Sequence, residues 1–219
     1  GATLDPDGCN FSVRSFGAEA MFVDLFDANE RFTDRIELSG GEDGVFSAHI
    51  SGVTAFQLYG LRAYGEYNPE EGKYFNPYKL LIDPYARALT DTHHNREDLL
   101  MGYAGRLEIP DKRDSAPVSP KCVVTAESYD WRDDKPPATP LHDLVIYETH
   151  VRGFSVHKSA GVRHPGTFAG LAEKIPYLKS LGINAVELLP VQQFFSREFL
   201  EENGLCEYWG YNTIAFLAP

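Results

Sequence analysis

The sequence predicts a multidomain protein with an N-terminal β-sandwich and a C-terminal segment in which strand and helix alternate. Three observations lead to this fold class. Short apolar runs separated by turn residues fill the first 60 positions, prolines then accumulate, and a strand–helix–strand pattern begins near residue 142. We place the boundaries at 1–110 for the sandwich with its extension, 111–141 for a proline-rich connector and 142–219 for the last segment.

Five apolar runs of four to seven residues are expected to form the strands of the sandwich. Gly, Asp and Asn occupy the gaps between them, as in residues 5–8 and 40–44, and interrupt any helical period before it covers two turns. The expected strands are 11–16, 20–26, 35–38, 45–50 and 55–59.

The last segment begins with a β-branched run at 144–148 and contains a second apolar strand at 183–190. The second run is apolar at successive positions, which is typical of a parallel strand buried on both faces. A helical pattern lies between the two runs. The three elements together predict a βαβ unit.

The intervening helix presents apolar residues at spacings of three and four. Thr167 is the expected N-cap, Pro176 should end or kink the helix or start a second one, and Gly182 should adopt the left-handed conformation at the C-terminal end. The apolar face consists of Phe168, Leu171, Ile175 and Leu178.

Charge and cysteine content restrict the partners. The chain has 20 Lys+Arg against 32 Asp+Glu, a formal net charge of −12, so we expect no nucleic-acid partner and no anionic membrane partner. No uninterrupted apolar stretch approaches the ~18 residues of a membrane-spanning helix. Cys9, Cys122 and Cys206 match no disulfide or zinc pattern and indicate free thiols in a reducing, cytoplasmic compartment.

Motifs for cofactors and metals are missing. Neither a phosphate-binding loop nor a dinucleotide-binding glycine pattern occurs, and the histidines, including the adjacent His93 and His94, lack metal-ligand spacing. We therefore expect no cofactor and no metal. Alternation along a strand would place Glu148 and His150 on one face. They could belong to a functional site or be buried, hydrogen-bonded residues, and we favour the second interpretation. The same two interpretations apply to Glu187.

Exposed aromatics are the remaining candidates for binding. Tyr208, Trp209 and Tyr211 surround a glycine in an expected loop, where their flat faces could contact sugar rings or anchor the loop. Trp131, among acidic residues and prolines, is expected to anchor the connector to the next domain.

Several of these stretches resemble isoamylase-type glycogen debranching enzymes of the α-amylase superfamily, glycoside hydrolase family 13. The later ones resemble the start of the catalytic (β/α)8 TIM barrel, and the earlier ones the end of the immunoglobulin-like, starch-binding-type sandwich before it. The resemblance rests on residues 58–65, 75–86, 145–154, 164–168, 173–191 and 208–212.

This resemblance implies hydrolysis of α-1,6 branch linkages in glycogen, limit dextrin or amylopectin by a retaining mechanism, with an Asp nucleophile and a Glu acid/base. It further implies that Tyr211 stacks on the reacting sugar and that Trp209 and Asn212 contribute to substrate binding.

The sequence departs from the family in lacking the segments that carry the catalytic carboxylates. His142-Asp143 has the composition of one of them but precedes the first strand, and residues 142–219 are far fewer than the ~250 that a barrel needs. We therefore expect a truncated barrel with no catalytic residue and no activity alone. Its unpaired edges would favour association between chains.

Two alternatives stay open. One is a non-catalytic glucan-binding or scaffold protein, although no Trp precedes Trp131 and the substitutes Tyr59, Tyr64 and Tyr67 are expected to pack against the barrel. The other is the start of a branching or trehalose-releasing enzyme of the same superfamily, which shares the Trp-Gly-Tyr loop.

Overall fold

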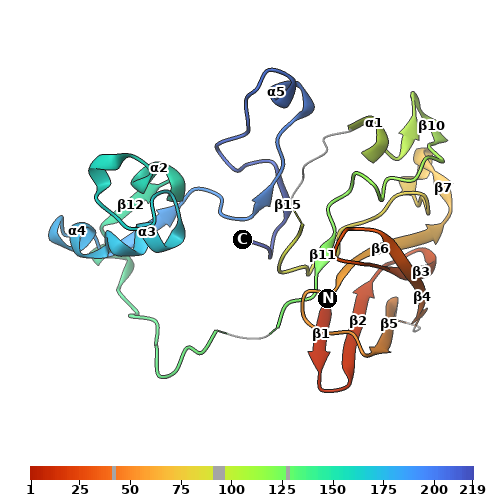
Figure 1. Cartoon of the computed structure of the whole chain (residues 1–219), viewed down its shortest axis with the longest axis horizontal. Coiled ribbons are helices and arrows are strands. Elements are labelled where there is room, and N and C mark those ends of the chain that lie inside the picture. Colours follow the sequence, from red (N-terminus) through yellow and green to blue (C-terminus); the bar gives the residue numbers. More distant parts are fainter. Residues whose placement is uncertain (41–42, 91–96, 127–128) are drawn as a thin grey trace. The chain divides into compact units, whose positions relative to one another are not determined.

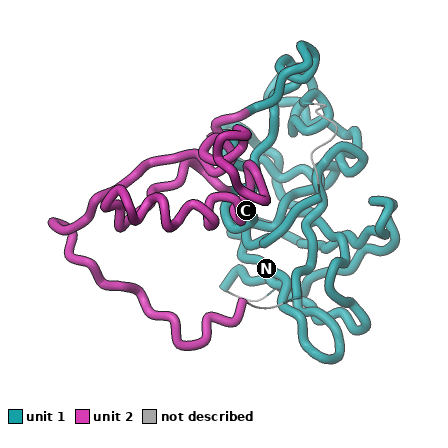
Figure 2. The backbone as a smooth tube through the Cα atoms, turned by 60° about the vertical axis from the view of Figure 1, so that its left-hand side comes forward, with its two compact units in different colours: residues 1–128, 192–207, 212–219 teal, residues 129–191, 208–211 magenta. Residues whose placement is uncertain are grey.

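The computed structural model describes residues 1–40, 43–90, 97–126 and 129–219. The chain forms two compact units, each composed of more than one stretch (Figure 2). Unit 1 comprises Gly1–Ser128, Gln192–Glu207 and Asn212–Pro219, and unit 2 comprises Tyr129–Val191 and Tyr208–Tyr211.

Unit 1 is built on a seven-stranded antiparallel sheet with the order β1-β2-β5-β4-β3-β6-β11 (Figure 1). Strand β4 pairs with β3 along most of its length and with β5 only at Ser39 and Gly40, so the sheet folds over there into two layers. The strands are β1 (Ala2–Asp5), β2 (Gly8–Arg14), β3 (Ala18–Phe26), β4 (Phe32–Gly40), β5 (Val45–Ser51), β6 (Leu58–Gly65) and β11 (Cys122–Val123).

The five strands expected from the apolar runs are confirmed as β2 to β6, although the run at 55–59 contributes only its last two residues to β6. Strand β1 was not predicted, because Ala2–Asp5 is too short and too mixed to show alternation. Smaller elements complete the unit: β7 (Tyr67–Asn68), η1 (Pro69–Glu71), β8 (Lys73–Tyr74), α1 (Glu97–Leu100), β9 (Tyr103–Ala104), β10 (Arg106–Pro110), β14 (Gln193–Phe194), α5 (Glu198–Glu202) and β15 (Thr213–Ala215).

The hydrophobic core lies between the two layers. Alternate residues of β3, namely Met21, Val23 and Leu25, point into it, as the period of two in a strand requires. The Phe11 and Tyr59 rings meet edge to face with their centroids 5.0 Å apart and join the two layers. This burial supplies the main stabilisation of the sandwich.

The opposite face of β3 carries a fully buried carboxylate. Asp24 accepts hydrogen bonds from Arg35 Nε at 2.6 Å, Arg35 Nη2 at 2.9 Å and Arg62 Nε at 2.9 Å. Arg62 Nη2 in turn donates to Asp114 Oδ1 at 2.8 Å. Two arginines thus compensate the desolvated Asp24, and one of them attaches the segment around Asp114 to the sheet.

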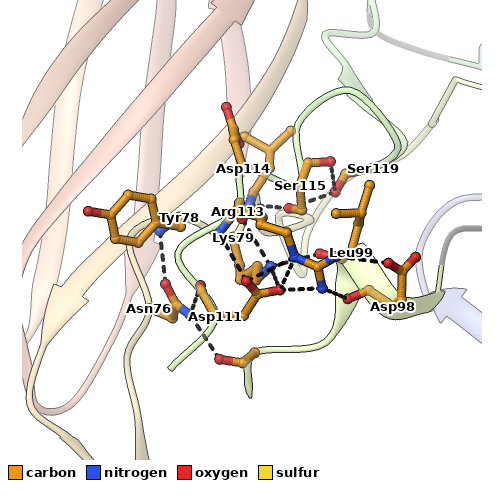
Figure 3. Close-up of polar contacts among 12 residues, drawn as sticks. Asn76, Tyr78, Lys79, Asp98, Leu99, Asp111, Arg113, Asp114, Ser115 and Ser119 are labelled. Atoms are coloured by element: carbon orange, nitrogen blue, oxygen red, sulfur yellow. Dashed lines mark hydrogen bonds and ion pairs between the residues drawn. The ribbon is translucent and has the colours of Figure 1, made fainter. Parts of the chain in front are cut away.

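A second polar cluster fixes the same segment (Figure 3). The buried Lys79 Nζ donates to Asp111 Oδ2 at 3.1 Å and to the carbonyl oxygens of Leu99 and Arg113 at 2.8 and 3.0 Å. Asn76 Nδ2 donates to the carbonyl oxygens of Gly102 and Asp111 at 2.9 and 2.8 Å. These bonds satisfy groups that would otherwise be costly to bury.

Part of the range predicted as a connector, 111–141, therefore belongs to unit 1. Lys121 is fully buried, and its Nζ donates to the carbonyl oxygens of Ala116 and Ser119 and contacts Glu30 Oε2 at 3.2 Å. This stretch forms a packed extension of the sandwich, because its backbone carbonyl oxygens accept hydrogen bonds from buried lysine side chains. Its prolines restrict the backbone to this path.

Unit 2 contains a parallel pair, β12 (Ile146–Thr149) and β13 (Ala185–Leu188), with Glu148 opposite Glu187 in the register. The predicted strands and the strand–helix–strand order are confirmed. The helical elements of the unit are η2 (Leu141–Asp143), α2 (Val151–Ser155), η3 (Lys158–Ala160), α3 (Phe168–Glu173) and α4 (Ile175–Ser180).

The connecting helix is divided in two at Lys174. Thr167 is confirmed as the N-cap, since its Oγ1 accepts from Gly170 N at 3.1 Å. Pro176 lies in the first turn of α4, where its missing N–H costs nothing, so it starts the second helix. Gly182 follows α4 with φ 81°, as expected for a left-handed C-terminal position.

The prediction that residues 183–190 form a strand buried on both faces is wrong for unit 2 as described. Val186 and Leu188 are exposed, because among residues 129–191 and 208–211 no further strand pairs with β12 or β13. Phe168 and Ile175 are also exposed, so the apolar face of the helix lacks part of its cover. Within the described ranges, no helix has the length and apolar character needed to cross a membrane.

A glycine at the start of β2 tests the close approach of β2 and β5. A Cβ at Gly8 would overlap the carbonyl oxygen of Ile50, which belongs to the paired strand and cannot move aside. We expect Gly8→Ala to lower the free energy of unfolding by roughly 3 kcal/mol, measured by urea denaturation. Gly102→Ala is the control, since nothing lies within 4 Å of a Cβ there; equal effects of the two variants would contradict this packing.

The cluster around Asp111 predicts a pH dependence. Hydrogen bonds from Arg113 and Lys79 hold the Asp111 pKa well below its usual range, so its stabilisation is complete above a pH of about 4 and is lost as the pH falls further. The stability difference between wild type and Asp111→Asn should be largest near neutrality and shrink towards about pH 2. Chemical denaturation across this range, with the exposed Asp7→Asn as control, measures it. A difference independent of pH would refute the assignment.

Candidate functional site

The loop 208–211 presents aromatic side chains from a backbone that only glycine allows. Gly210 has φ 81°, and a Cβ there would lie 2.8 Å from the carbonyl oxygen of Pro190. The turn brings the Trp209 and Tyr211 rings together edge to face, with centroids 5.5 Å apart. Tyr208, Trp209 and Tyr211 each remain about half exposed, so the loop offers aromatic faces to solvent.

His150 fastens this loop to the end of β12. Its Nδ1 accepts from Gly153 N at 3.1 Å, which caps helix α2 and leaves the proton on Nε2. Nε2 then donates to the Tyr208 carbonyl oxygen at 2.7 Å. The His150 and Tyr208 rings are stacked 4.2 Å apart at an interplanar angle of 8°.

Gly153 makes this stacking possible, because a Cβ at that position would collide with the Tyr208 hydroxyl. Sequence reasoning identified the aromatic loop but missed the partnership of His150 with Tyr208. The two residues are 58 positions apart, so no local spacing could have revealed it.

Glu148, His150 and Glu187 differ from their predicted arrangement. Strand β12 ends at Thr149, so His150 is a helix cap and does not share a strand face with Glu148. Glu148 and Glu187 are exposed, and the interpretation of both as buried polar residues is wrong. Among residues 129–191 and 208–211 no further strand pairs with β12 or β13, which explains their exposure.

Asn212, the third predicted substrate-binding residue, lies in unit 1, whereas Trp209 and Tyr211 lie in unit 2. Its Nδ2 is buried and has no hydrogen-bond partner within the part of the chain that is described. The structure thus brings Trp209 and Tyr211 into contact with each other, whereas Asn212 belongs to the other unit.

Comparison with known proteins addresses the sandwich first. Residues 1–86 match the family described as carbohydrate-binding module 48, the isoamylase N-terminal domain. The matched stretch covers β1 to β8 and ends at Ala86, before the extension that packs on it.

The remainder of the chain is also similar to known proteins. A glycogen debranching enzyme of Yersinia enterocolitica is 44% identical over 218 residues, which are 98% of this chain but only 32% of that enzyme. The chain thus spans about a third of the length of this curated relative and is similar to its N-terminal portion. A complete catalytic domain of that kind is not present in these residues.

Solved pullulanase structures share the fold. Pullulanase type I from Bacillus subtilis, complexed with maltose, has a TM-score of 0.69 and 25% identity, covering 100% of this chain and 27% of that one. Pullulanase from Bacillus acidopullulyticus has a TM-score of 0.70, with 22% identity and coverage of 100% and 25%. The resemblance to the N-terminal portion of family 13 glycoside hydrolases is confirmed.

The tyrosines considered as sugar platforms in the module have structural roles. Tyr59 is buried in the sandwich core, where its hydroxyl donates to Asp83 Oδ2 at 2.8 Å and burial raises its pKa well above the usual range. The Tyr67 hydroxyl donates to the Leu107 carbonyl oxygen at 2.7 Å. Tyr64 packs edge to face on Phe22. All these partners belong to unit 1.

The structure does not bear out the expected anchoring role of Trp131. Its side chain is 67% exposed and packs edge to face on Tyr129, with centroids 4.8 Å apart. Both rings lie in a stretch without regular structure, where charged neighbours keep the chain at the surface.

The thiols of the module and its extension are poor nucleophiles. Burial raises the pKa of Cys9 to about 11 and that of Cys122 to about 12, whereas Cys206 is exposed. Across the ranges that the structure describes, no group of three or more His, Cys, Asp or Glu residues is arranged to hold a metal ion. His93 and His94 lie outside those ranges.

The fastening of the aromatic loop by His150 can be tested through Trp209. The chain has two tryptophans, so Trp131→Phe leaves Trp209 as the sole tryptophan, whose fluorescence can be excited selectively over that of the tyrosines. In this background His150→Ala removes the cap and the stacked ring, and we expect greater acrylamide quenching of Trp209 and a loss of about 1 kcal/mol in stability. His157→Ala is the matched control, since His157 caps η3 in the same unit. Equal quenching in both variants would show that His150 does not hold the loop.

Proposed function

We propose that this chain is the N-terminal portion of a glycogen debranching enzyme that hydrolyses α-1,6 linkages in glycogen, limit dextrin or amylopectin with retention of configuration. The observation that carries the proposal is the 44% identity over 98% of the chain to a glycogen debranching enzyme. In this proposal residues 1–86 hold branched glucan, and 142–219 begin the catalytic (β/α)8 barrel.

The geometry of unit 2 supports the barrel assignment. β12 and β13 are parallel and joined through helices α2, α3 and α4, which is the repeating unit of such a barrel. Both strands have free edges within the unit, and their apolar side chains are exposed where neighbouring strands and helices would cover them. Such edges also favour association between chains.

The aromatic loop would contribute substrate contacts. It follows β13, and active sites of these barrels form at the C-terminal ends of the strands. We assign Tyr211 to stacking on the sugar at the scissile bond and Trp209 and Asn212 to contacts around it. A neutral sugar ring offers C–H faces to such aromatics, which is compatible with a chain of net charge −12.

No residue of this chain receives a catalytic role. Retaining hydrolysis needs two carboxyl groups about 5 to 5.5 Å apart, one of which is tuned to act as an acid. Glu148 and Glu187 are register neighbours, but both are exposed to solvent, which does not provide such tuning. The proposal therefore places the nucleophile and the acid/base in residues that this chain does not contain.

A non-catalytic glucan-binding protein is the second candidate, favoured by the carbohydrate-binding module itself. A branching or trehalose-releasing enzyme of the same superfamily would share the architecture. We propose a cytoplasmic location, supported by the free thiols of Cys9, Cys122 and Cys206.

Reducing-end assays on glycogen limit dextrin test the function. We expect the 219-residue chain alone to release no new reducing ends. The longer protein that carries it should cleave α-1,6 linkages. In the longer protein Tyr211→Ala should lower kcat/KM about 100-fold through lost positioning of the sugar, whereas the exposed Phe216→Ala should not. Activity of the chain alone would refute the absence of catalytic carboxylates. Transfer or trehalose release by the longer protein would select the other superfamily reactions.

A further inference from the structure

A cavity of about 840 Å³ lies within unit 1, at the end of the sandwich where β2 turns into β3. Its floor consists of core residues of β2, β3 and β6, and its mouth is formed by the turn 15–17 and the hairpin β7–β8. All of its lining residues except Leu100 and Gly102 lie in the stretch that matches carbohydrate-binding module 48. Its size suits a ligand of several hundred cubic ångströms.

Two aromatic side chains stand exposed at the mouth. Phe16 is 74% exposed, and the Arg14 guanidinium lies 4.6 Å from its ring centroid. Tyr74 is also exposed and is held edge to face against Tyr67 at a centroid distance of 6.4 Å. Exposed rings fixed by neighbours lose little entropy when a ligand stacks on them.

A third ring shapes the wall. Gly65 at the end of β6 would place a Cβ 2.7 Å from Phe75, so the absence of a side chain there lets Phe75 lie directly on the strand. Gly17, with φ 88°, turns the chain in front of the same ring. The cavity is thus shaped by backbone geometry.

Charged side chains of both signs line the cavity, namely Arg14, Glu19, Glu66, Lys73 and Lys79. Lys73 Nζ lies 2.6 Å from Glu66 Oε2, and Lys79 pairs with Asp111. Its hydrogen bond to Lys73 lowers the pKa of Glu66, which keeps that carboxylate charged. Apolar walls with paired charges of both signs suit an uncharged ligand rich in hydroxyl groups.

We infer that this cavity binds a segment of a linear α-1,4-glucan chain, with Phe16 and Tyr74 stacking on the sugar faces and Glu66 and Lys73 meeting the hydroxyls. The choice of a glucan rests on the proposed function. The site itself rests on the cavity, its exposed rings and the match of its lining to a carbohydrate-binding module. It differs from the loop 208–211, which belongs to unit 2.

Titration with maltoheptaose tests the inference on the whole 219-residue chain. We expect calorimetric binding together with saturable amide shifts of Gly17, Gly72 and Gly102, which line the cavity. Phe16→Ala and Tyr74→Ala should each weaken binding about fivefold to tenfold. The matched control is Phe56→Ala, because Phe56 is 80% exposed in the same unit but is not part of the lining. Thermal unfolding verifies that each variant is folded. If one of the two cavity variants does not fold, the other still tests the site.

Three outcomes would overturn the site. The first is unchanged affinity in both cavity variants, and the second is absence of binding at millimolar maltoheptaose. The third is amide shifts that depend only on the concentration of the chain, which would report a second copy of the chain in the cavity. Loss of affinity in Tyr211→Ala alone would move glucan binding to the aromatic loop. None of these results affects limit-dextrin cleavage by the longer protein, so failure of this site and failure of the proposed function are distinguishable.

Discussion

The burial of the Asp24 carboxylate is the constraint on which the arrangement of unit 1 depends. A charge removed from water in the middle of β3 is tolerated only if it is paired and fully hydrogen-bonded. Arg35 and Arg62 provide this from the strands on either side, so the order β4-β3-β6 is fixed by polar contacts as well as by the apolar core. Arg62 is itself buried and needs a further acceptor, which Asp114 supplies.

Buried charged groups are also paired farther along the extension. Asp114 lies in the same stretch as Asp111, whose carboxylate pairs with Lys79 and Arg113. The buried Lys121 donates hydrogen bonds to carbonyl oxygens of its own segment. It directly precedes β11, which pairs with the edge of β6. The sandwich and its extension are therefore one structure, in which buried cations meet backbone carbonyls at several points.

The sequence predicted the strands of the sandwich, the βαβ order, Thr167 as a cap and Gly182 as a terminator, because these depend on local periodicity and backbone conformation. It did not reveal that 111–124 packs on the sandwich, since proline content describes stiffness and not the partners of buried lysines. Side-chain burial in unit 2 was overestimated for a related reason: an apolar strand is buried only where other elements cover it. Of the candidate site, the aromatic loop was evident from composition, but its attachment through His150 depends on a contact between distant residues.

Gly210 separates how the aromatic loop is positioned from which side chains it presents to solvent. The turn is directed by a left-handed backbone pressed against the Pro190 carbonyl oxygen, and Tyr208 is held by His150, so Trp209 and Tyr211 carry none of the restraints that these contacts impose. Their rings can change in size or polarity while the path of the backbone stays the same. The surface that this loop presents can therefore change by single substitutions that leave the fold unchanged.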